Sequence, residues 1–340
     1  MLGRIVGAVR FKEPLSFHTS LRIGGNSDFF VVPQDLDDVR YAMAFAEHEQ
    51  LPVFVIGGGN NVLVSDRGLQ AVVLKLNGIL GRAEFHGEEV AAGGGVSLSA
   101  LIREAAALGL GGLECLAGIP ATIGGAIATN AGTREGALVD LCSSVYFLHP
   151  DGTLGEHRPS GYTSGQPLDL PAGAIVIGAR LRLVRRAAKE IHADIRQRLR
   201  VRKASQPIAL ASAGYIWRNP PGALAERLVS AVGLRGKRLN GAEISSKCGN
   251  FIVNRGGATD RDILALMDMM RERVAARFGV TLRAEIRMLG FPAAISEPEP
   301  LELAAAREPR SEDPALTREA RASGWRGVRP RCPVASLARR

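Results

Sequence analysis

The sequence has few aromatic residues and no long uninterrupted apolar stretch. Phe, Trp and Tyr make up 5% of its 340 residues, which leaves little material for stacking nucleic-acid bases. The longest weakly polar stretch, residues 116–131, is interrupted by three glycines and a proline, so it cannot form the continuous apolar helix that crosses a bilayer. The first ten residues contain two arginines but no apolar run of a secretory signal. We therefore expect a cytoplasmic protein without a membrane partner.

Closely spaced cysteines and histidines are also missing. Four cysteines, Cys115, Cys142, Cys248 and Cys332, lie far apart, and no C-x-x-C pair occurs. The six histidines are scattered without the spacing of zinc ligands. These absences predict reduced, structural thiols and no metal site.

What is present is the composition of a soluble globular protein, with 46% apolar and 23% charged residues. A chain of this length is expected to form two or three domains. Most of the formal charge of +9 lies in residues 180–203, where ten Lys and Arg residues face only Glu190 and Asp194. We favour a solvated basic helix face for this segment, ahead of a role in attracting an anionic nucleotide. Because this segment contains no aromatic residue, nucleic-acid binding is the least favoured of the three interpretations.

Hydrophobic periodicity and turn residues predict three regions followed by a tail. In the first region we expect strands at 28–32, 53–56 and 71–76 and a helix at 36–50. In the second we expect a strand from residue 88, a helix at 98–108, and strands at 144–148 and 174–184. In the third we expect helices at 191–203, 224–232 and 259–278 and strands at 212–217, 250–254 and 282–289. The tail, residues 292–340, lacks apolar periodicity and is expected to be disordered.

Two glycine-rich segments indicate a nucleotide cofactor. Gly57-Gly58-Gly59-Asn60-Asn61 directly follows a buried strand, and its exposed N–H groups suit a diphosphate. The segment is not the dinucleotide fingerprint of a doubly wound domain, because no helix follows it. Alone, such a turn is more often a tight hairpin. Residues 111–126 supply a second glycine-dense stretch, which suits a flat ligand lying against main chain.

The ordered motifs resemble UDP-N-acetylenolpyruvoylglucosamine reductases over about residues 11–290. They are the runs H-T-S-L-R-I-G-G, G-G-G-N-N-V-L-V and L-A-G-I-P-A-T-I-G-G-A, followed by R-N-P, G-N-F-I-V-N and E-I-R, at residues 18–25, 57–64, 116–126, 218–220, 249–254 and 285–287. The chain is similar to the shorter subtype of that family.

This resemblance implies an α+β fold. A two-subdomain FAD-binding unit of the vanillyl-alcohol-oxidase (PCMH) type precedes an α/β C-terminal substrate domain. We expect FAD-binding subdomains at 1–85 and 86–188, a substrate domain at 189–291 and the tail at 292–340. The residues that the resemblance assigns to FAD are Gly57, Gly58, Gly59, Asn60, Asn61, Gly118, Ile119, Pro120, Thr122, Gly124 and Gly125.

The resemblance also implies a reaction. NADPH reduces FAD, and the flavin then reduces UDP-N-acetylglucosamine enolpyruvate to UDP-N-acetylmuramate, a step of peptidoglycan precursor synthesis in the cytoplasm. We expect a monomer whose partner is this small UDP-sugar, with no nucleic acid. The residues implied to bind the substrate are Tyr162, Arg218, Asn219 and Asn250.

Three positions carry the chemistry in the family, and two of them differ here. Glu285 matches the family's glutamate, whereas Tyr215 stands where a proton-donating serine is expected and Thr163 where an arginine is expected. Milder departures are Asn60 for a serine, Ala121 for a glycine, and Cys248 for a histidine. Three hypotheses therefore stay open. The protein is an active reductase in which Tyr215 donates the proton, a paralogue that binds FAD or a UDP-sugar without turnover, or a flavoenzyme for another nucleotide sugar.

Overall fold

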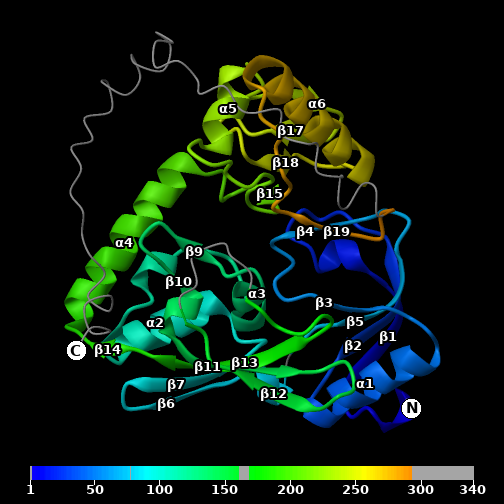
Figure 1. Ribbon diagram of the computed structural model, residues 1–340, viewed down its shortest axis with the longest axis vertical. Helices are drawn as coiled ribbons and strands as arrows, with labels where there is room; N and C mark the ends of the chain where they lie inside the picture. Colours follow the sequence, from blue (N-terminus) through cyan, green and yellow to red (C-terminus); the bar gives the residue numbers. More distant parts are fainter. Residues whose placement is uncertain (1, 77, 161–167, 293–340) are drawn as a thin grey trace.

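The computed structural model describes residues 2–76, 78–160 and 168–292, which form three units around a central cavity (Figure 1). The first unit packs one helix against a four-stranded sheet of order β1-β2-β5-β3, in which β1 pairs antiparallel with β2 and the other pairs are parallel. Its elements are β1 Ala8–Pro14, β2 Asn26–Val32, α1 Leu36–His48, β3 Val53–Val55, β4 Val62–Val64 and β5 Leu69–Leu74. Asp35 caps α1 by accepting a hydrogen bond from the N–H of Asp38.

The second unit is built on an antiparallel sheet of order β12-β11-β13-β7-β6, with α2 and α3 beside it. Its elements are β6 Ala83–His86, β7 Glu89–Gly93, α2 Leu98–Ala107, β8 Leu110–Gly111, α3 Ile123–Ala128, β9 Gly132–Thr133, β10 Gly136–Ala137, β11 Cys142–Leu148, β12 Leu154–His157, β13 Ile175–Arg182 and β14 Val184–Arg185. Because β6 pairs with β7, we place the boundary between the first two units before Ala83 rather than between residues 85 and 86.

The third unit sits above the other two in Figure 1 and is reached through the long helix α4. Its antiparallel sheet has the order β15-β18-β17-β16, and α5 and α6 cover it. The elements are α4 Ala188–Ser205, β15 Ala211–Ser212, α5 Ala225–Ala231, β16 Arg238–Leu239, β17 Ala242–Ile244, β18 Ile252–Asn254, α6 Asp260–Phe278 and β19 Arg287–Leu289. A capping box of Thr259 and Asp262 begins α6, and Gly279 in the left-handed conformation ends it.

Short 3-10 helices complete the chain: η1 Leu2–Arg4, η2 Leu15–Phe17, η3 Gly78–Gly81, η4 Glu114–Leu116 and η5 Leu138–Leu141.

The hydrophobic core joins the units as well as filling them. Val31 and Val39 of the first unit pack in one buried cluster with Leu148 and Ile175 of the second. The third unit's core likewise takes in Leu63, beside the first glycine segment. In addition, β19 leaves the third unit and pairs in parallel with β4 of the first. The cavity walls are therefore held together by shared core.

Most predicted elements are confirmed within a few residues, but two predicted strands are much shorter. Of 212–217 only Ser212 lies in a strand, β15, because Gly214 turns the chain at a positive φ of 77°. Of 282–289 only Arg287–Leu289 is strand, because the segment first bridges Trp217 through Ala284 and then crosses to the first unit. The predictions missed β1, an edge strand in which no residue is fully buried, so its sequence shows no alternation between an apolar and a polar face.

Within the described residues, no helix combines the length and the apolar character that a bilayer crossing requires. The predicted tail lies outside the described residues, apart from Pro292.

Candidate functional site

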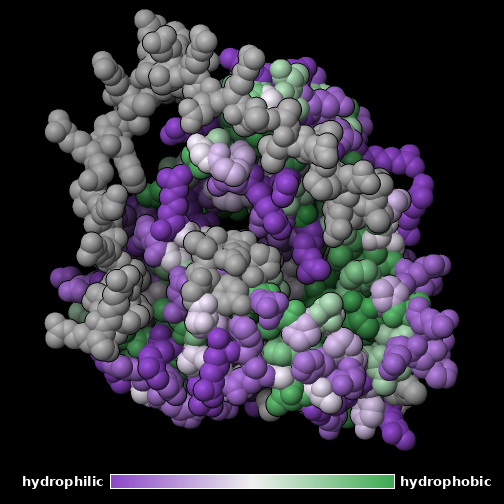
Figure 2. All heavy atoms as spheres, in the orientation of Figure 1, coloured by the Kyte–Doolittle hydropathy of each residue, from purple (hydrophilic) through white to green (hydrophobic). Residues whose placement is uncertain are grey.

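A cavity of about 750 Å³ lies where the three units meet, a size within the range of about 300–1,000 Å³ typical of ligand sites. In Figure 2 the visible face is hollowed near its centre, with mainly hydrophilic residues beside the hollow. We call the two glycine segments, residues 57–61 and 118–125, the floor of this cavity. We call five of the side chains that α4 and the third unit contribute its wall: Arg202, Gln206, Tyr215, Phe251 and Glu285.

The first glycine segment presents open main-chain donors. Among the described residues, the N–H groups of Gly57, Gly58 and Gly59 have no hydrogen-bond partner. Gly59 has a φ of 64°, and a Cβ there would collide with the carbonyl oxygen of His18, so only glycine suits the position. The loop is held in place by Ser20, whose hydroxyl donates to the carbonyl oxygens of Gly59 at 2.9 Å and of Ser212 at 2.6 Å.

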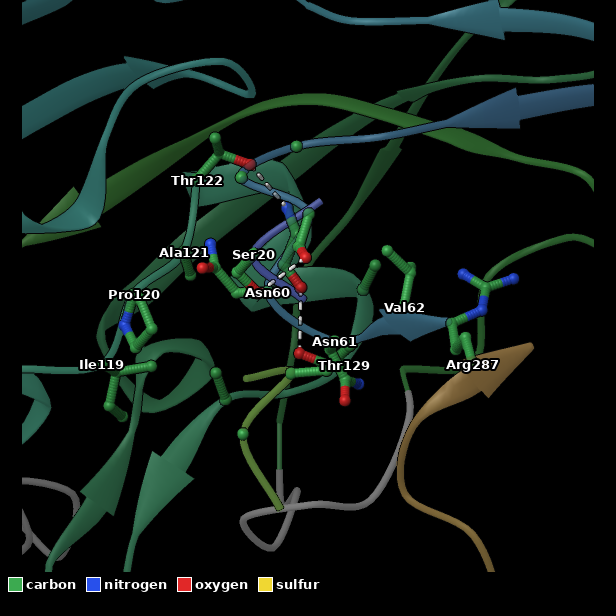
Figure 3. A pocket seen from close by; sticks show the side chains of 18 of the residues that line it. Ser20, Asn60, Asn61, Val62, Ile119, Pro120, Ala121, Thr122, Thr129 and Arg287 are labelled. Atoms are coloured by element: carbon green, nitrogen blue, oxygen red, sulfur yellow. Dashed lines mark hydrogen bonds between the residues drawn. The ribbon is translucent and has the colours of Figure 1, made fainter. Parts of the chain in front are cut away.

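The second glycine segment lies against the first. A Cβ on Gly57 would collide with the side chain of Thr122, so the two segments approach more closely than side chains would allow. Thr122 caps α3 by accepting a hydrogen bond from the N–H of Gly125 at 3.3 Å. Figure 3 shows Ile119, Pro120 and Thr122 on one side of the cavity and Arg287 on the other.

All eleven residues predicted to bind the cofactor line this single cavity. They come from two units, separated by more than fifty residues in the chain, and the fold brings them together. The two segments together, rather than either alone, make a surface of main chain that suits a flat nucleotide.

On the wall, Glu285 is the principal carboxyl group. It lines the cavity and forms an ion pair with Arg218, whose Nε lies 3.2 Å from its Oε2. Burial raises the pKa of Glu285, although Arg218 opposes that shift. The Glu285 N–H bonds to the carbonyl oxygen of Ile216, and its own carbonyl oxygen accepts from Asn61 Nδ2 at 3.2 Å. The main chain of Glu285 is thus fixed to both the third unit and the first glycine segment.

Tyr215 lies on the chain segment beside Glu285 and also lines the cavity. Its ring packs edge-on against Phe251, with 5.0 Å between ring centroids, and its hydroxyl lies 3.1 Å from Gln206 Nε2. Although 45% of the residue is exposed, burial raises the pKa of the phenol and Cys248 adds to that rise. A neutral phenol facing the cavity is a proton donor.

The residues predicted to bind the substrate lie behind the wall or outside the described chain. Arg218 contacts Glu285, and Asn219 Oδ1 accepts from the N–H of Ala225. Asn250 is 2% exposed, and its side chain bonds the main-chain N–H and carbonyl oxygen of Trp217. None of the three is among the cavity-lining residues that the structure describes. Their predicted contacts with substrate stay predictions.

Tyr162 and Thr163 lie outside the described residues, so their predicted roles stay predictions.

Several polar residues of the cavity were missed by the sequence prediction, among them two arginines and a glutamine. Arg202 and Gln206 line the cavity from α4 and its C-terminal end, and Arg287 lines it from β19. Leu199 also faces it. Since Leu199, Arg202 and Gln206 are spaced i, i+3 and i+7, the helical period within the basic segment was the available signal. Much of that segment is the exposed basic face that we predicted, with one buried residue in α4.

Two of the described cysteines are poor nucleophiles. Burial raises the pKa of Cys142 to about 12 and that of Cys248 to about 11, so both thiols stay protonated at neutral pH. Within the described residues, no three His, Cys, Asp or Glu side chains are grouped so that they could hold a metal ion.

Comparison with known sequences agrees with this geometry. Residues 27–156 match the family described as FAD binding domain, and residues 206–289 match the C-terminal domain of UDP-N-acetylenolpyruvoylglucosamine reductase. A UDP-N-acetylenolpyruvoylglucosamine reductase of Geobacter metallireducens is 41% identical over 285 residues, which cover 84% of this chain and 95% of the relative. The chain belongs to the UDP-N-acetylenolpyruvoylglucosamine reductase family.

Two further relatives extend this family assignment to the fold. A UDP-N-acetylenolpyruvoylglucosamine reductase 2 of Symbiobacterium thermophilum is 40% identical over 288 residues, covering 84% of this chain and 93% of the relative. The crystal structure of the Thermus caldophilus reductase superimposes with a TM-score of 0.73 at 35% identity and covers 83% of this chain and 99% of that one. The predicted fold, a two-part FAD-binding unit followed by a C-terminal reductase domain, is confirmed.

Proposed function

We propose that the protein reduces UDP-N-acetylglucosamine enolpyruvate to UDP-N-acetylmuramate, using NADPH as reductant and FAD as cofactor. The observation that carries this proposal is the joint position of Glu285 and Tyr215 on the wall of the cavity whose floor is the glycine segments. A site that only bound a nucleotide would not need two proton-exchanging groups beside the ligand.

The floor fits FAD. Main-chain N–H groups of Gly57, Gly58 and Gly59 without partners suit the oxygens of a diphosphate. Gly118, Thr122 and the residues between them supply the opposite surface. FAD bound there would supply hydride transfer between NADPH and the substrate.

Reduction of a carbon–carbon double bond requires one hydride and one proton. The protein's own contribution is therefore to bind the anionic substrate and to deliver the proton. Arg202 and Arg287 line the cavity, and no ion pair joins either of them to a carboxylate within the described ranges. They are suited to the phosphates and carboxylate of a UDP-sugar enolpyruvate.

Tyr215 would hold the proton at its hydroxyl oxygen. A phenol with a pKa near 10 is a stronger acid than a serine hydroxyl, so the family's proton-donor role remains chemically available at this position. Glu285, held by Arg218, would place a carboxyl group against the reacting end of the substrate. Both assignments follow from position and acidity, and they favour an active reductase over a relative that only binds its ligands.

The experiment is an assay of NADPH oxidation in the presence and absence of UDP-N-acetylglucosamine enolpyruvate, with the purified protein loaded with FAD. We expect oxidation that depends on the sugar nucleotide and yields UDP-N-acetylmuramate. Flavin that binds without sugar-dependent oxidation at high enzyme concentration would refute the proposal and leave a binding protein.

A further inference from the structure

Three side chains link the second glycine segment to Tyr215 along the cavity wall. Arg202 Nη1 lies 3.5 Å from the carbonyl oxygen of Gly118 and 3.4 Å from Gln206 Oε1. Gln206 Nε2 in turn lies 3.1 Å from the Tyr215 hydroxyl. All four residues line the same cavity, so the chain of contacts runs from its floor to its wall.

The hydrogen-bond donors and acceptors among Arg202, Gln206 and Tyr215 can be assigned in one way only. A guanidinium donates hydrogen bonds and cannot accept them, so Gln206 must present its carbonyl oxygen to Arg202. The amide nitrogen then faces Tyr215, and an amide nitrogen also only donates. The hydroxyl oxygen of Tyr215 is therefore an acceptor toward Gln206, and its hydrogen points elsewhere.

The surroundings of Tyr215 leave that hydrogen for a ligand. The ring is fixed by its edge-on contact with Phe251, and Gln206 makes the one hydrogen bond to the hydroxyl within the described residues. The charged or titratable groups that act on the phenol are Arg202 of α4, Glu226 of α5 and Cys248. Cys248 has a pKa of about 11 and is a neutral thiol.

We propose that Arg202 and Gln206 are positioning residues that turn the Tyr215 hydroxyl so that it donates its proton into the cavity. The identity of the acceptor rests on the proposed function: it is an alkene carbon of the substrate. In that step the Tyr215 O–H bond breaks and a C–H bond forms, while the other alkene carbon takes the hydride that NADPH supplies. The phenolate then regains a proton from water.

The direction of the hydrogen bond can be measured without turnover. The ultraviolet absorbance of phenolate is titrated in the wild type and in Tyr215→Phe, and the difference gives the pKa of Tyr215. If Gln206 donates to Tyr215, it stabilises the phenolate, so Gln206→Leu raises this pKa. If Tyr215 instead donated to Gln206, the bond would stabilise the phenol, and Gln206→Leu would lower the pKa. A lowered or unchanged value overturns the proposal.

The role of Arg202 is tested by combining variants. In an Arg202→Met background the amide of Gln206 is free to rotate, so the effect of Gln206→Leu on the Tyr215 pKa shrinks. Arg200→Met is the matched control, because Arg200 lies on the same helix but is exposed and lines no part of the cavity. An undiminished effect in the Arg202→Met background would remove Arg202 from the proposal.

Turnover gives a separate readout. We expect Gln206→Leu to lower kcat roughly tenfold with little change in KM, since one neutral hydrogen bond is lost, whereas Gln197→Leu on the exposed face of α4 has no effect. In a Tyr215→Phe background, Gln206→Leu should cause no further loss, and a full additional loss would count against the positioning role. If the wild type shows no turnover at all, the proposed function fails while the titration still decides the hydrogen-bond direction.

Discussion

The floor and the wall of the cavity differ in the chemical groups that they present to a ligand. The floor consists of main chain, where glycines expose N–H groups and allow residues 57–61 and 118–125 to touch. The wall consists of side chains, and its chemistry depends on single residues such as Glu285 and Tyr215. A floor of this kind is sensitive to an added Cβ where a glycine packs closely against its neighbours, since the new atom displaces the main chain whose N–H groups hold the ligand. Substitution in the wall instead changes the acid or base that is available.

The comparison predicts that substitutions in the wall lower turnover and leave the cofactor bound, whereas substitutions in the floor weaken binding of the cofactor. The largest effect is expected for Glu285→Gln. Loss of an acid–base group lowers the rate by roughly 10²- to 10⁴-fold, which corresponds to about 3–5 kcal/mol. The measurement is sugar-dependent NADPH oxidation, with flavin absorbance of the purified protein as the binding readout.

Glu272→Gln is the matched control for that variant, because Glu272 lies on the exposed face of α6. A loss of less than tenfold for Glu285→Gln would show that this carboxyl group is dispensable. If Glu285→Gln lost bound flavin to the same extent as turnover, the contributions of floor and wall would not be separable.

A somewhat smaller effect is expected for Tyr215→Phe. This variant keeps the ring and its packing against Phe251 but removes the proton, so we expect turnover to fall roughly 10²-fold, the lower end for a general acid. Tyr41→Phe, on α1 and away from the cavity, serves as control. Unchanged turnover would show that another group donates the proton and that Tyr215 contributes only packing to the wall.

The same division explains what the sequence could predict. The glycine-rich segments indicated a nucleotide site, because open main chain requires glycine and leaves a pattern in the sequence, and the family resemblance then assigned eleven residues of the floor to FAD. Arg202 and Gln206 were missed because their function depends on which face of α4 meets the cavity. Asn219 and Asn250 carried a predicted contact with substrate, yet their amides bond the main chain of Ala225 and Trp217. That distinction depends on packing between distant segments, which local sequence does not contain.

The floor itself is tested by Gly59→Ala. The left-handed conformation costs an L residue roughly 1–2 kcal/mol, and the new Cβ also collides with the carbonyl oxygen of His18. We expect weaker FAD retention, by roughly tenfold, and a lower Tm. Gly222→Ala is the matched control, because its φ of 74° is similar but nothing lies within 4 Å of the added Cβ. If both variants retain FAD equally, the close approach of Gly59 to the carbonyl oxygen of His18 is unimportant for FAD binding.

The smallest effect is expected where the first unit is joined to the third. Asp66, just after β4, and Asp260, at the start of α6, each accept a hydrogen bond from the other's main-chain N–H, at 2.8 and 2.9 Å. Burial raises the pKa of Asp66, and the charge of Asp260 adds to the rise. A carboxyl whose pKa is raised by folding stabilises the fold below about pH 3.8, and this stabilisation is lost as the pH rises through the folded value.

Asp66→Asn keeps the acceptor oxygen and removes the charge, so we expect a more stable protein at pH 7. The gain is at most about 1 kcal/mol, because solvent reaches the exposed residue and screens its charge even though it is partly desolvated. The difference in unfolding free energy, measured in urea, should disappear below about pH 3.8, where both proteins are neutral at this position. A variant that is less stable at pH 7 would mean that the charged Asp66 strengthens the joint. In that case the charged carboxylate would stabilise the contact between the first and third units, despite the cost of its partial burial.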